Sequence, residues 1–530
     1  MLLLQQLAYI HPNKDVLFED ISLSLPKRAK AALVGNNGSG KSTLLKVIAG
    51  DLAPAAGSIT AGDRLYYVPQ HFGQFNELTV ARALRVDQKI AALHRVLEGD
   101  LSDATLAALD DDWTIEERCR EALQHWGLDG LRLDRPMDAL SGGQKTKVFL
   151  AGIAIHQPGI VLLDEPSNHL DTGGRHLLYD LIQSSPATLL VVSHDRTLLN
   201  LLDPVCELSK RGLTVYGGNY DFYAEQKALE LNALDQDIKS REKAIRKAKE
   251  VERETAERRQ RLEARGKKKQ EKAGTPTIMM NTLRNNAEKS TSRLKEAQGE
   301  KIRGLAQELA DLRKELPDAD KMKFGFDDSG LHNGKILVAA TGINFSYDHR
   351  PLWHQPLTFT ITSGDRIALK GGNGSGKTTL VNLILGALEP AAGTLHRADN
   401  QAVYIDQEYS LVDNALTVYE QAQQFNFSAL QEHEVKIRLS WFLFGKDDWD
   451  KPCSALSGGE KMRLILCCLT ISNRAPDLIV LDEPTNNLDL QNIAILSAAV
   501  NGYQGTLLVI SHDAYFLKEV GVEKVIELKA

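Results

Sequence analysis

Short apolar runs alternate with longer amphipathic stretches along most of the chain. The runs are rich in Val, Leu and Ile and are flanked by polar residues, as in "AALVG", "IVLLDEP" and "TLLVVSH". Strands that are buried on both faces of a parallel sheet have this continuous apolar character, and the helices that cover such a sheet are amphipathic. The pattern therefore predicts α/β domains, each built on a parallel sheet with helices packed against it.

The same set of motifs occurs twice, in the same order. The first half of the chain contains "GNNGSGKST", "LSGGQK", "LLDEPSNHLD" and "VVSHD", and the second half contains "GGNGSGKTT", "LSGGEK", "VLDEPTNNLD" and "VISHD". Such a repeat predicts two homologous domains and a connecting linker. The expected boundaries are 1–217 for the first domain, 218–333 for the linker and 334–530 for the second domain.

One spacing differs between the two copies. Lys41 lies 100 positions before Ser141, whereas Lys377 lies 80 positions before Ser457. The first domain therefore carries additional residues, and they fall within 71–139. We expect them to elaborate a helical subdomain.

Composition and charge are those of an ordinary globular protein of two or three domains. The chain has 530 residues, of which 43% are hydrophobic and 25% charged, and its formal net charge is −7. No apolar run reaches the ~18 residues of a transmembrane helix, and the first residues lack the basic segment of a signal peptide. The five cysteines show no CxxC pairing, which favours free thiols over disulfides or metal ligands. We therefore expect a soluble, cytoplasmic protein.

Each GxxxxGK[ST] motif lies between an apolar run and a helical stretch, where it predicts a phosphate-binding loop. Glycines let backbone N–H groups surround phosphate oxygens, and the following helix N-terminus adds its positive dipole end. Lys41 and Lys377 are expected to contact the β- and γ-phosphates, and Ser42 and Thr378 to offer a hydroxyl to Mg²⁺. The candidate ATP-binding residues of the two loops are Gly35, Asn36, Asn37, Gly38, Ser39, Gly40, Lys41, Ser42, Thr43, Gly371, Gly372, Asn373, Gly374, Ser375, Gly376, Lys377, Thr378 and Thr379.

Each "LDEP" sequence places two adjacent carboxylates at the end of an apolar run. Asp164 and Asp482 are expected to organise Mg²⁺. Glu165 and Glu483 are expected to be the general bases that orient or deprotonate the attacking water.

A Ser-His-Asp sequence follows a later apolar run in each domain, at Ser193–Asp195 and Ser511–Asp513. A nucleophilic triad is one interpretation, but the members of such a triad are spread through a fold and are not consecutive. We expect instead that His194 and His512 sense the γ-phosphate during hydrolysis. Glu165 precedes His194 by 29 positions, and Glu483 precedes His512 by 29 as well.

A signature sequence, LSGG, comes shortly before each LDEP sequence and is followed by helical sequence. Its serine hydroxyl and glycine amides predict a second anion site at a helix N-terminus. P-loop, signature, LDEP and Ser-His-Asp in this order resemble the ATP-binding-cassette ATPases, and the resemblance covers both domains. The signature residues are Ser141, Gly142, Gly143, Gln144, Ser457, Gly458, Gly459 and Glu460.

The resemblance implies two cassettes that clamp two ATP molecules head to tail. The P-loop of each cassette would then face the signature of the other, so that residues 35–42 pair with Ser457–Glu460 and residues 371–378 pair with Ser141–Gln144.

The resemblance also implies an aromatic side chain that stacks on adenine upstream of each P-loop. Tyr347 is suited to this role, whereas the equivalent residue of the first domain is His11, for which a solvated loop position is the alternative. The other residues implied by the resemblance are Gln70 and Gln407, near Mg²⁺, and the D-loop aspartates Asp171 and Asp489.

The linker concentrates positive charge in an otherwise acidic chain. From Lys239 to Lys269 there are 14 Lys or Arg residues against 6 Asp or Glu residues. Apolar positions at helical spacing on both sides, with Gly274 and Pro276 between them, predict an antiparallel helical hairpin with a basic, loop-like tip near residues 266–290. A solvated coiled-coil face is one interpretation of the basic run, and contact with a phosphate backbone is the other. The candidate RNA-binding residues are Arg258, Arg259, Arg261, Arg265, Lys267, Lys268, Lys269, Lys272 and Arg284.

Two cassettes in one chain, the charged linker and the sequence "YGGNYDFYAEQK" before it resemble the ABC-F family. Ser167 and Asn487 depart from the family's "DEPTNHLD" sequence. The resemblance implies an ATPase that acts as a monomer through pairing of its own cassettes. It also implies ribosome binding near the tRNA exit site, with the linker directed toward the P-site tRNA and the peptidyl-transferase centre. Members of this family carry an insertion called the arm in their first cassette. The additional residues within 71–139 could correspond to this arm, which is the alternative to an elaborated helical subdomain.

Several alternatives stay open at the level of sequence. A soluble ATPase subunit of a membrane transporter shares the catalytic motifs, although a long basic hairpin between cassettes is not expected in it. A DNA-repair ATPase is the third alternative, but such proteins usually split one cassette across a coiled coil or carry zinc-binding CxxC modules, and this sequence shows neither pattern. Within the ABC-F interpretation, the sequence does not distinguish modulation of translation from protection of ribosomes against antibiotics, nor equal from unequal ATP sites.

Overall fold

The computed structural model describes residues 1–209, 211–273, 296, 299–313, 334–347, 350–372, 374–472, 475–486 and 488–528. The chain divides into two compact units. One unit comprises Met1–Tyr223 and Met322–Ala530 and contains both predicted cassettes, and the other, Ala224–Lys321, is the central helical segment.

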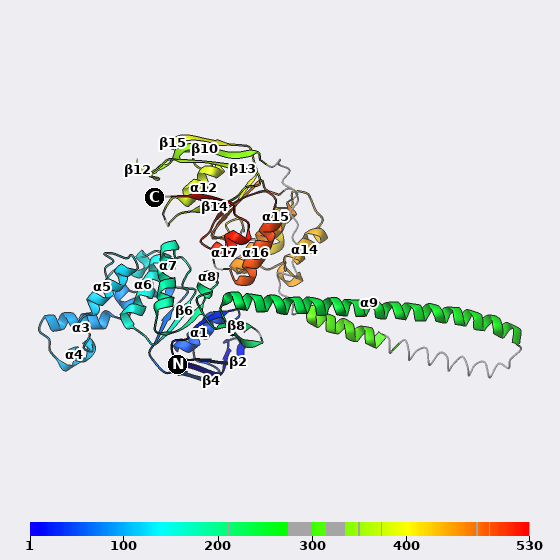
Figure 1. Cartoon of the computed structure of the whole chain (residues 1–530), viewed down its shortest axis with the longest axis horizontal. Helices are drawn as coiled ribbons and strands as arrows, with labels where there is room; N and C mark the ends of the chain where they lie inside the picture. The colour runs from blue at the N-terminus through cyan, green and yellow to red at the C-terminus, as the bar shows by residue number, and fades with distance from the viewer. Residues whose placement is uncertain are drawn as a thin grey trace. The chain divides into compact units, whose positions relative to one another are not determined.

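The first cassette is built around β-strands (Figure 1). They are β1 (Leu2–Ile10), β2 (Val16–Leu25), β3 (Lys30–Val34), β4 (Ala56–Ala61), β5 (Leu65–Val68), β6 (Ile160–Asp164), β7 (Thr188–Val192), β8 (Val205–Ser209) and β9 (Gly212–Tyr216). An antiparallel sheet has the order β2-β1-β4, and a second sheet has the order β5-β6-β7-β3-β8-β9. All neighbours in the second sheet are parallel except β8 and β9. The three quoted apolar runs correspond to β3, β6 and β7, so the predicted parallel sheet is confirmed.

Helices cover this sheet because its strands are apolar on both faces. Ala31 and Leu33 of β3 enter one core together with helix α1, and Ala32 and Val34 enter the core on the other face. The helices are α1 (Lys41–Ala49), α2 (Val80–Ala83), α3 (Asp87–Leu97), α4 (Asp103–Leu109), α5 (Ile115–His125), α6 (Gly142–His156), α7 (Thr172–Ser184) and α8 (Arg196–Leu199), with short 3-10 turns at Gly73–Phe75 and Met137–Ala139.

The additional residues of the first cassette form α3 and α4. A β-bridge between Thr79 and Pro136 closes the helical subdomain, and the equivalent bridge in the second cassette joins Thr417 and Pro452. The first bridge encloses α2 to α5, whereas the second encloses only two α-helices. Figure 1 shows α3 and α4 at the outer end of the first cassette. Elaboration of the helical subdomain stays the prediction for these residues, and an arm stays the alternative.

The second cassette repeats the plan of the first. Its strands are β10 (Ile336–Asn344), β11 (Ser346–Tyr347), β12 (Arg350–Pro351), β13 (Leu357–Thr362), β14 (Arg366–Lys370), β15 (Ala392–Arg397), β16 (Ala402–Ile405), β17 (Leu478–Asp482), β18 (Thr506–Ile510) and β19 (Lys524–Glu527). Its helices are α12 (Lys377–Leu385), α13 (Val418–Gln424), α14 (Glu432–Trp441), α15 (Gly458–Ile471), α16 (Leu490–Gly502) and α17 (Ala514–Glu519), with 3-10 turns at Lys446–Asp448 and Cys453–Ala455. The parallel sheet has the order β16-β17-β18-β14-β19, and an antiparallel sheet has the order β13-β10-β15.

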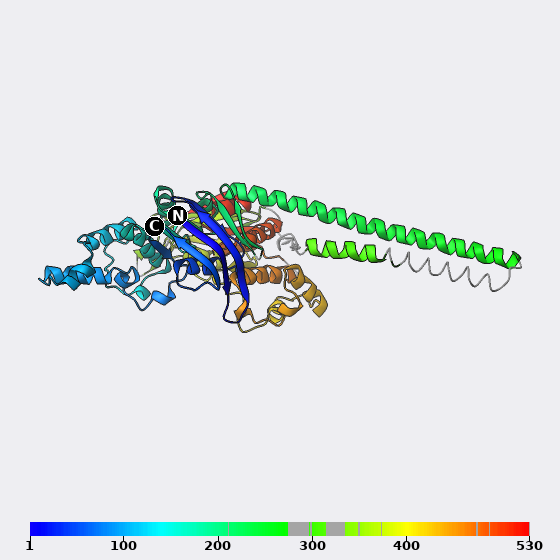
Figure 2. The same cartoon turned by 90° about the horizontal axis from the view of Figure 1, so that it is seen from below.

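The linker is helical, as predicted. Helix α9 (Tyr220–Ala273) is 54 residues long, and a helix over residues 299–313 returns alongside it (Figures 1 and 2). Two ion pairs join them: Arg241 to Glu308 at 3.0 Å and Arg313 to Glu242 at 2.6 Å. Because α9 continues through Gly266, the expectation that the loop-like tip begins near residue 266 is wrong. The helix is described as far as Ala273, directly before the predicted helix breaker.

None of the helices in the described ranges combines the length and the apolar character of a membrane span. The five cysteines are free and buried.

Candidate active sites

The ends of three neighbouring strands bring the predicted site residues of each cassette together. In the first cassette β6, β7 and β3 are adjacent and parallel, so their carboxyl ends lie at one edge of the sheet. The P-loop follows β3, Glu165 follows β6, and His194 comes two residues after β7. Strands β17, β18 and β14 repeat this arrangement in the second cassette.

The first P-loop is a tightly packed cradle. Lys41 Nζ donates hydrogen bonds to the carbonyl oxygens of Gly35 at 2.6 Å and Asn36 at 3.1 Å. A Cβ atom at Gly35 would lie 2.3 Å from the carbonyl oxygen of Leu208, so only glycine fits there. The Ser39 hydroxyl is buried without a hydrogen-bond partner among the described residues. Glycine backbone and an unpaired buried hydroxyl fit a loop that binds phosphate oxygens.

The second P-loop has the same features. Lys377 Nζ donates to the carbonyl oxygen of Gly371 at 2.8 Å, and the Ser375 hydroxyl is buried without a partner in the described part of the chain. Trp353 Nε1 donates to the Ser375 carbonyl oxygen at 2.9 Å and so ties the loop to the cassette core. Asn373, a predicted ATP-binding residue, lies outside the described residues.

Both P-loops lead directly into a helix. Gly40 and Gly376 cap α1 and α12 with φ values of 97° and 86°, which lie in the left-handed region that favours glycine. The remaining predicted loop residues lie in the turn or in the first turn of the helix: Asn37, Gly38, Ser42, Thr43, Gly372, Gly374, Thr378 and Thr379.

Oxygen donors suited to Mg²⁺ lie beside each P-loop. Ser42 Oγ donates to Asp164 Oδ1 at 3.1 Å, and the Tyr67 hydroxyl donates to Asp164 Oδ2 at 3.3 Å. In the second cassette the Tyr404 hydroxyl donates to Asp482 Oδ2 at 2.8 Å. Burial raises the pKa of both aspartates above its usual range, and a bound cation would offset this effect. Hydroxyl and carboxylate oxygens fit Mg²⁺.

Mg²⁺ retains several waters and takes further ligands from substrate phosphates, so one or two protein carboxylates suffice to hold it. Accordingly, the described residues contain no group of three or more His, Cys, Asp or Glu arranged to hold a metal. Gln70 and Gln407 come two residues after β5 and β16, respectively. Their roles at the metal, like that of Thr378, stay predictions.

Glu165 and Glu483 share an unusual backbone conformation. Their φ values are 50° and 46°, in the left-handed region that residues other than glycine rarely adopt. The neighbouring strand holds this conformation, because Glu165 N donates to Val192 O at 2.9 Å and Glu483 N donates to Ile510 O at 2.8 Å. Backbone strain of this kind is concentrated at functional sites. The conformation supports a special role for both glutamates.

Each glutamate faces the predicted switch histidine of its own cassette. Glu165 Oε1 lies 3.1 Å from His194 Nε2, and Glu483 Oε1 lies 3.3 Å from His512 Nε2. Burial raises the pKa of both glutamates, to about 7 for Glu483. Burial also lowers the pKa of both histidines, to about 4 for His512. A carboxylate that titrates near neutral pH is suited to accept a proton from water, and both imidazoles are neutral at this pH.

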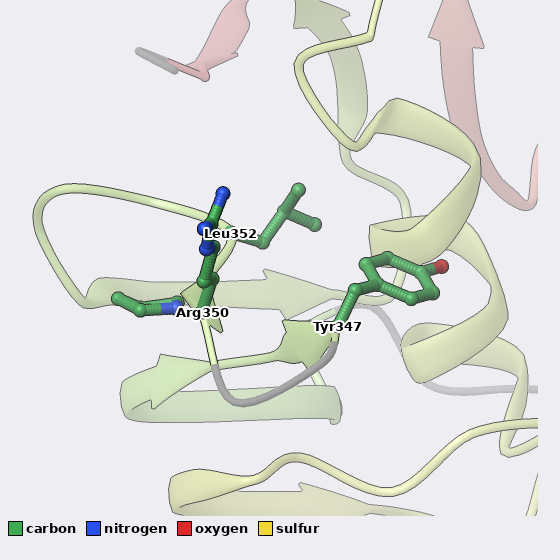
Figure 3. Close-up of a pocket in the computed structure, with 4 residues that line it drawn as sticks. Tyr347, Arg350 and Leu352 are labelled. Carbon is green, nitrogen blue, oxygen red and sulfur yellow. The ribbon is translucent and has the colours of Figure 1, made fainter.

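The predicted adenine contacts differ between the cassettes. Tyr347 is 54% exposed, its hydroxyl lies 3.1 Å from Thr379 Oγ1 of α12, and it lines an open pocket with Arg350, Pro351 and Leu352. Figure 3 shows the Tyr347 ring on one side of this pocket and Arg350 and Leu352 on the other.

His11 lies in the turn between β1 and β2, where its ring meets the Tyr9 ring edge-on at 5.6 Å between centroids. Adenine stacking at both positions stays a prediction.

The signature serines begin helices. Ser141 caps α6 and Ser457 caps α15, each in a capping box with Gln144 or Glu460 three residues later. The sequence analysis did not predict these capping boxes, although a serine followed three residues later by Gln or Glu indicates one in both motifs. Gly142, Gly143, Gly458 and Gly459 form the first turns of these helices. Their pairing with the P-loop of the opposite cassette stays a prediction.

The D-loop aspartates cap helices as well, and one of them crosses to the other cassette. Asp171 accepts from Gly174 N at the start of α7. Asp489 Oδ1 accepts from Asn492 N at the start of α16, while its Oδ2 accepts from Asn37 N of the first P-loop at 2.7 Å.

Sequence reasoning missed several residues of these sites. Tyr67 and Tyr404 stand three residues before Gln70 and Gln407, so alignment of the two repeats would have revealed them. Thr172, which lies 2.9 Å from His512 Nδ1, carries no such signal, since the second repeat has Leu490 at the equivalent position.

Comparisons with known proteins agree with this geometry. The sequence profile of the family described as ABC transporter matches residues 18–168 and 354–486. ATP-binding protein YdiF of Bacillus subtilis is 31% identical over 97% of this chain and 78% of its own length. ATP-binding protein YbiT of Escherichia coli O157:H7 is 30% identical over 95% of this chain and 92% of its own length. The energy-dependent translational throttle protein EttA of Mycobacterium tuberculosis is 30% identical over 96% of this chain and 88% of its own length.

Solved structures show the same fold. A chain in the complex of archaeal ribosomal stalk protein aP1 with ribosome recycling factor aABCE1 superposes with a TM-score of 0.59. It is 20% identical and the match covers 98% of this chain and 87% of that one. At this identity the likeness concerns the fold alone, a tandem arrangement of two cassettes.

Proposed function

The chain belongs to the ABC-F family of ATP-binding-cassette ATPases, and we propose that it uses ATP hydrolysis to control its own association with the ribosome. The observation that carries this proposal is the combination, in one chain, of two cassettes and a long helical hairpin with a basic, exposed face. The name of the relative EttA, which refers to energy-dependent throttling of translation, also supports a role in translation.

Each cassette supplies the groups that hydrolysis needs. In the first, Lys41 binds the β- and γ-phosphates, Glu165 accepts a proton from the attacking water, and His194 presents Nε2 to the γ-phosphate. Lys377, Glu483 and His512 act in the same way in the second cassette. Mg²⁺, held by Asp164 with Ser42 and by Asp482 with Thr378, would neutralise charge on the phosphates. ATP binding closes the cassettes on each other, and hydrolysis releases them.

The basic face of α9 is the proposed RNA contact. Arg258, Arg261 and Arg265 are exposed, and none forms an ion pair with a described side chain. Their spacing of three and four residues places them on one face of the helix, in its last third. Exposed guanidinium groups on one face of a helix suit a phosphate backbone, because binding releases condensed counterions.

The remaining basic candidates belong to the same proposal. The side chains of Arg259, Lys267, Lys268, Lys269 and Lys272, as well as all of Arg284, lie outside the described residues. Within the proposal, the protein acts as a cytoplasmic monomer and binds near the tRNA exit site. Its hairpin extends toward the P-site tRNA and the peptidyl-transferase centre, and recognition depends on RNA shape and phosphate more than on sequence. Modulation of translation and protection of ribosomes are both compatible with this placement.

Replacing Arg258, Arg261 and Arg265 with Gln is expected to weaken binding to purified ribosomes by about tenfold or more at 0.1 M salt. Each lost phosphate contact reduces the magnitude of the slope of log K against log salt by roughly 0.7–0.9. For the triple variant, the magnitude of this slope should therefore fall by about 2–3. The measurement is a binding titration at several salt concentrations.

A matched control is available on the same helix. Lys243, Arg246 and Lys247 are also exposed, and they lie about 25 Å nearer the start of α9 at 1.5 Å per residue. Their replacement with Gln removes the same amount of charge as the first triple variant, but it should leave most of the affinity for ribosomes. Equal losses in the two triple variants would indicate non-specific attraction and would contradict the assignment of the contact to the distal face.

A further inference from the structure

The hydroxyl of Thr172 reaches from the first cassette to the switch histidine of the second. Thr172 is the first residue of α7, directly after Asp171, and its Oγ1 lies 2.9 Å from His512 Nδ1. The other ring nitrogen of His512, Nε2, lies 3.3 Å from Glu483 Oε1. Thr172, His512 and Glu483 therefore form a continuous polar chain that ends at the proposed general base.

The other site lacks this contact. His194 Nε2 lies 3.1 Å from Glu165 Oε1, as in the second cassette. Its Nδ1, however, is buried without a hydrogen-bond partner among the described residues. Leu490, the residue after Asp489, stands where Thr172 stands in the first repeat, and its side chain packs against the apolar core of the first cassette. A leucine cannot hydrogen-bond to the ring.

The chemistry of imidazole gives the Thr172 contact a consequence. A neutral imidazole carries its proton on one nitrogen, and the hydrogen bond made by the other nitrogen decides which one. Glu483 Oε1 faces Nε2, and an ionised carboxylate only accepts, so the proton lies on Nε2 and the Thr172 hydroxyl donates to Nδ1. In that tautomer, Nε2–H can donate to Glu483 or to a phosphate oxygen, and the ring cannot rotate without breaking the contact.

We propose that Thr172 is a positioning residue for ATP hydrolysis at the second site: from the opposite cassette it holds His512 in the orientation and tautomer that direct Nε2–H toward Glu483, and no described residue does this for His194 at the first site. The two ATP sites are therefore chemically unequal. Because the contact joins the cassettes, hydrolysis at the second site also depends on the placement of the first cassette. This inference rests on the proposed roles of Glu483 and His512.

The test measures one site at a time. In a Glu165→Gln background turnover comes from the second site, and in a Glu483→Gln background it comes from the first. Thr172→Val keeps the shape of the side chain and removes its hydroxyl, while Thr172→Ser keeps the hydroxyl. Steady-state kcat and KM for ATP are measured for both substitutions in both backgrounds. The role of Glu483 is verified separately, by comparing the Glu165→Gln variant with the Glu165→Gln, Glu483→Gln double variant. The second substitution should abolish the ATP turnover that remains in the single variant.

Thr172→Val is expected to lower kcat at the second site by roughly five- to tenfold, as loss of one hydrogen bond implies, with KM changed less than about twofold. Thr172→Ser should retain most of kcat, and neither substitution should change kcat at the first site by more than about twofold. Equal losses at both sites, a change in KM alone, or equal impairment by Ser and Val would each overturn the proposal. Such outcomes would assign Thr172 to packing or to ATP binding.

Discussion

Replacing both Glu165 and Glu483 with Gln is expected to lower steady-state ATP hydrolysis by about 10²–10⁴-fold, the usual contribution of a general base. The two glutamates face the P-loop edge of the sheet and titrate near neutral pH because they are buried. Glutamine keeps the size of the side chain but cannot accept the proton of the attacking water. Phosphate release from ATP at saturating concentration is the measurement.

Nucleotide affinity distinguishes loss of chemistry from loss of binding. The double variant should bind ATP with a Kd within about threefold of the unchanged protein, because Lys41 and Lys377 are intact. A control variant with Glu98→Gln and Glu523→Gln replaces exposed glutamates, one in each cassette, and should hydrolyse ATP normally. Turnover above a tenth of the normal rate in the Glu165, Glu483 double variant would contradict the assignment of these residues as the bases.

Trp353→Ala is expected to destabilise the second cassette by about 3–5 kcal/mol, the range for removal of a large buried aromatic side chain. Trp353 is 1% exposed and packs in the core beneath the P-loop helix. Its Nε1 holds the Ser375 carbonyl oxygen, and Asn344 holds its backbone through hydrogen bonds at 2.7 and 3.2 Å. The substitution thus removes apolar volume and an anchor of the P-loop together. Affinity for ATP at this site should fall as well.

Hydrogen exchange at the amides of β14 and α12 measures this effect, because it reports the stability of one cassette separately from the other. Trp353→Phe keeps most of the apolar volume and loses the donor, so it should cost about 1–2 kcal/mol. Trp113→Ala, at a tryptophan that is 51% exposed, should change stability by less than about 0.5 kcal/mol. Full protection of these amides in Trp353→Ala would contradict the anchoring role.

Much of each site could be predicted because it depends on local sequence. Continuous apolar runs identified the parallel strands, and their carboxyl ends placed Asp164, Glu165 and His194 at one edge with the P-loop. The unequal spacing between P-loop and signature located the insertion that forms α3 and α4. These features follow from the periodicity of strands and helices and from backbone chemistry at glycine, which one sequence records directly.

Other features could not be predicted because they depend on how distant surfaces meet. Asn37 contacts Asp489, and Thr172 contacts His512, across more than 300 positions of sequence. No periodic pattern marks such pairs, since single polar residues at loop ends have many possible partners. The left-handed backbone of Glu165 and Glu483 likewise cannot be read from the sequence, because it is held by the hydrogen bond that each backbone N–H donates to the adjacent strand and does not follow from the residue type.

We propose that the ATP-bound state of this protein binds the ribosome. The most direct test is co-sedimentation of the Glu165→Gln, Glu483→Gln variant with purified ribosomes, with and without ATP. The variant should bind ATP without hydrolysing it, and it should therefore pellet with ribosomes when ATP is present and stay in the supernatant when it is absent. A variant that binds ATP yet remains in the supernatant under both conditions would contradict the claim.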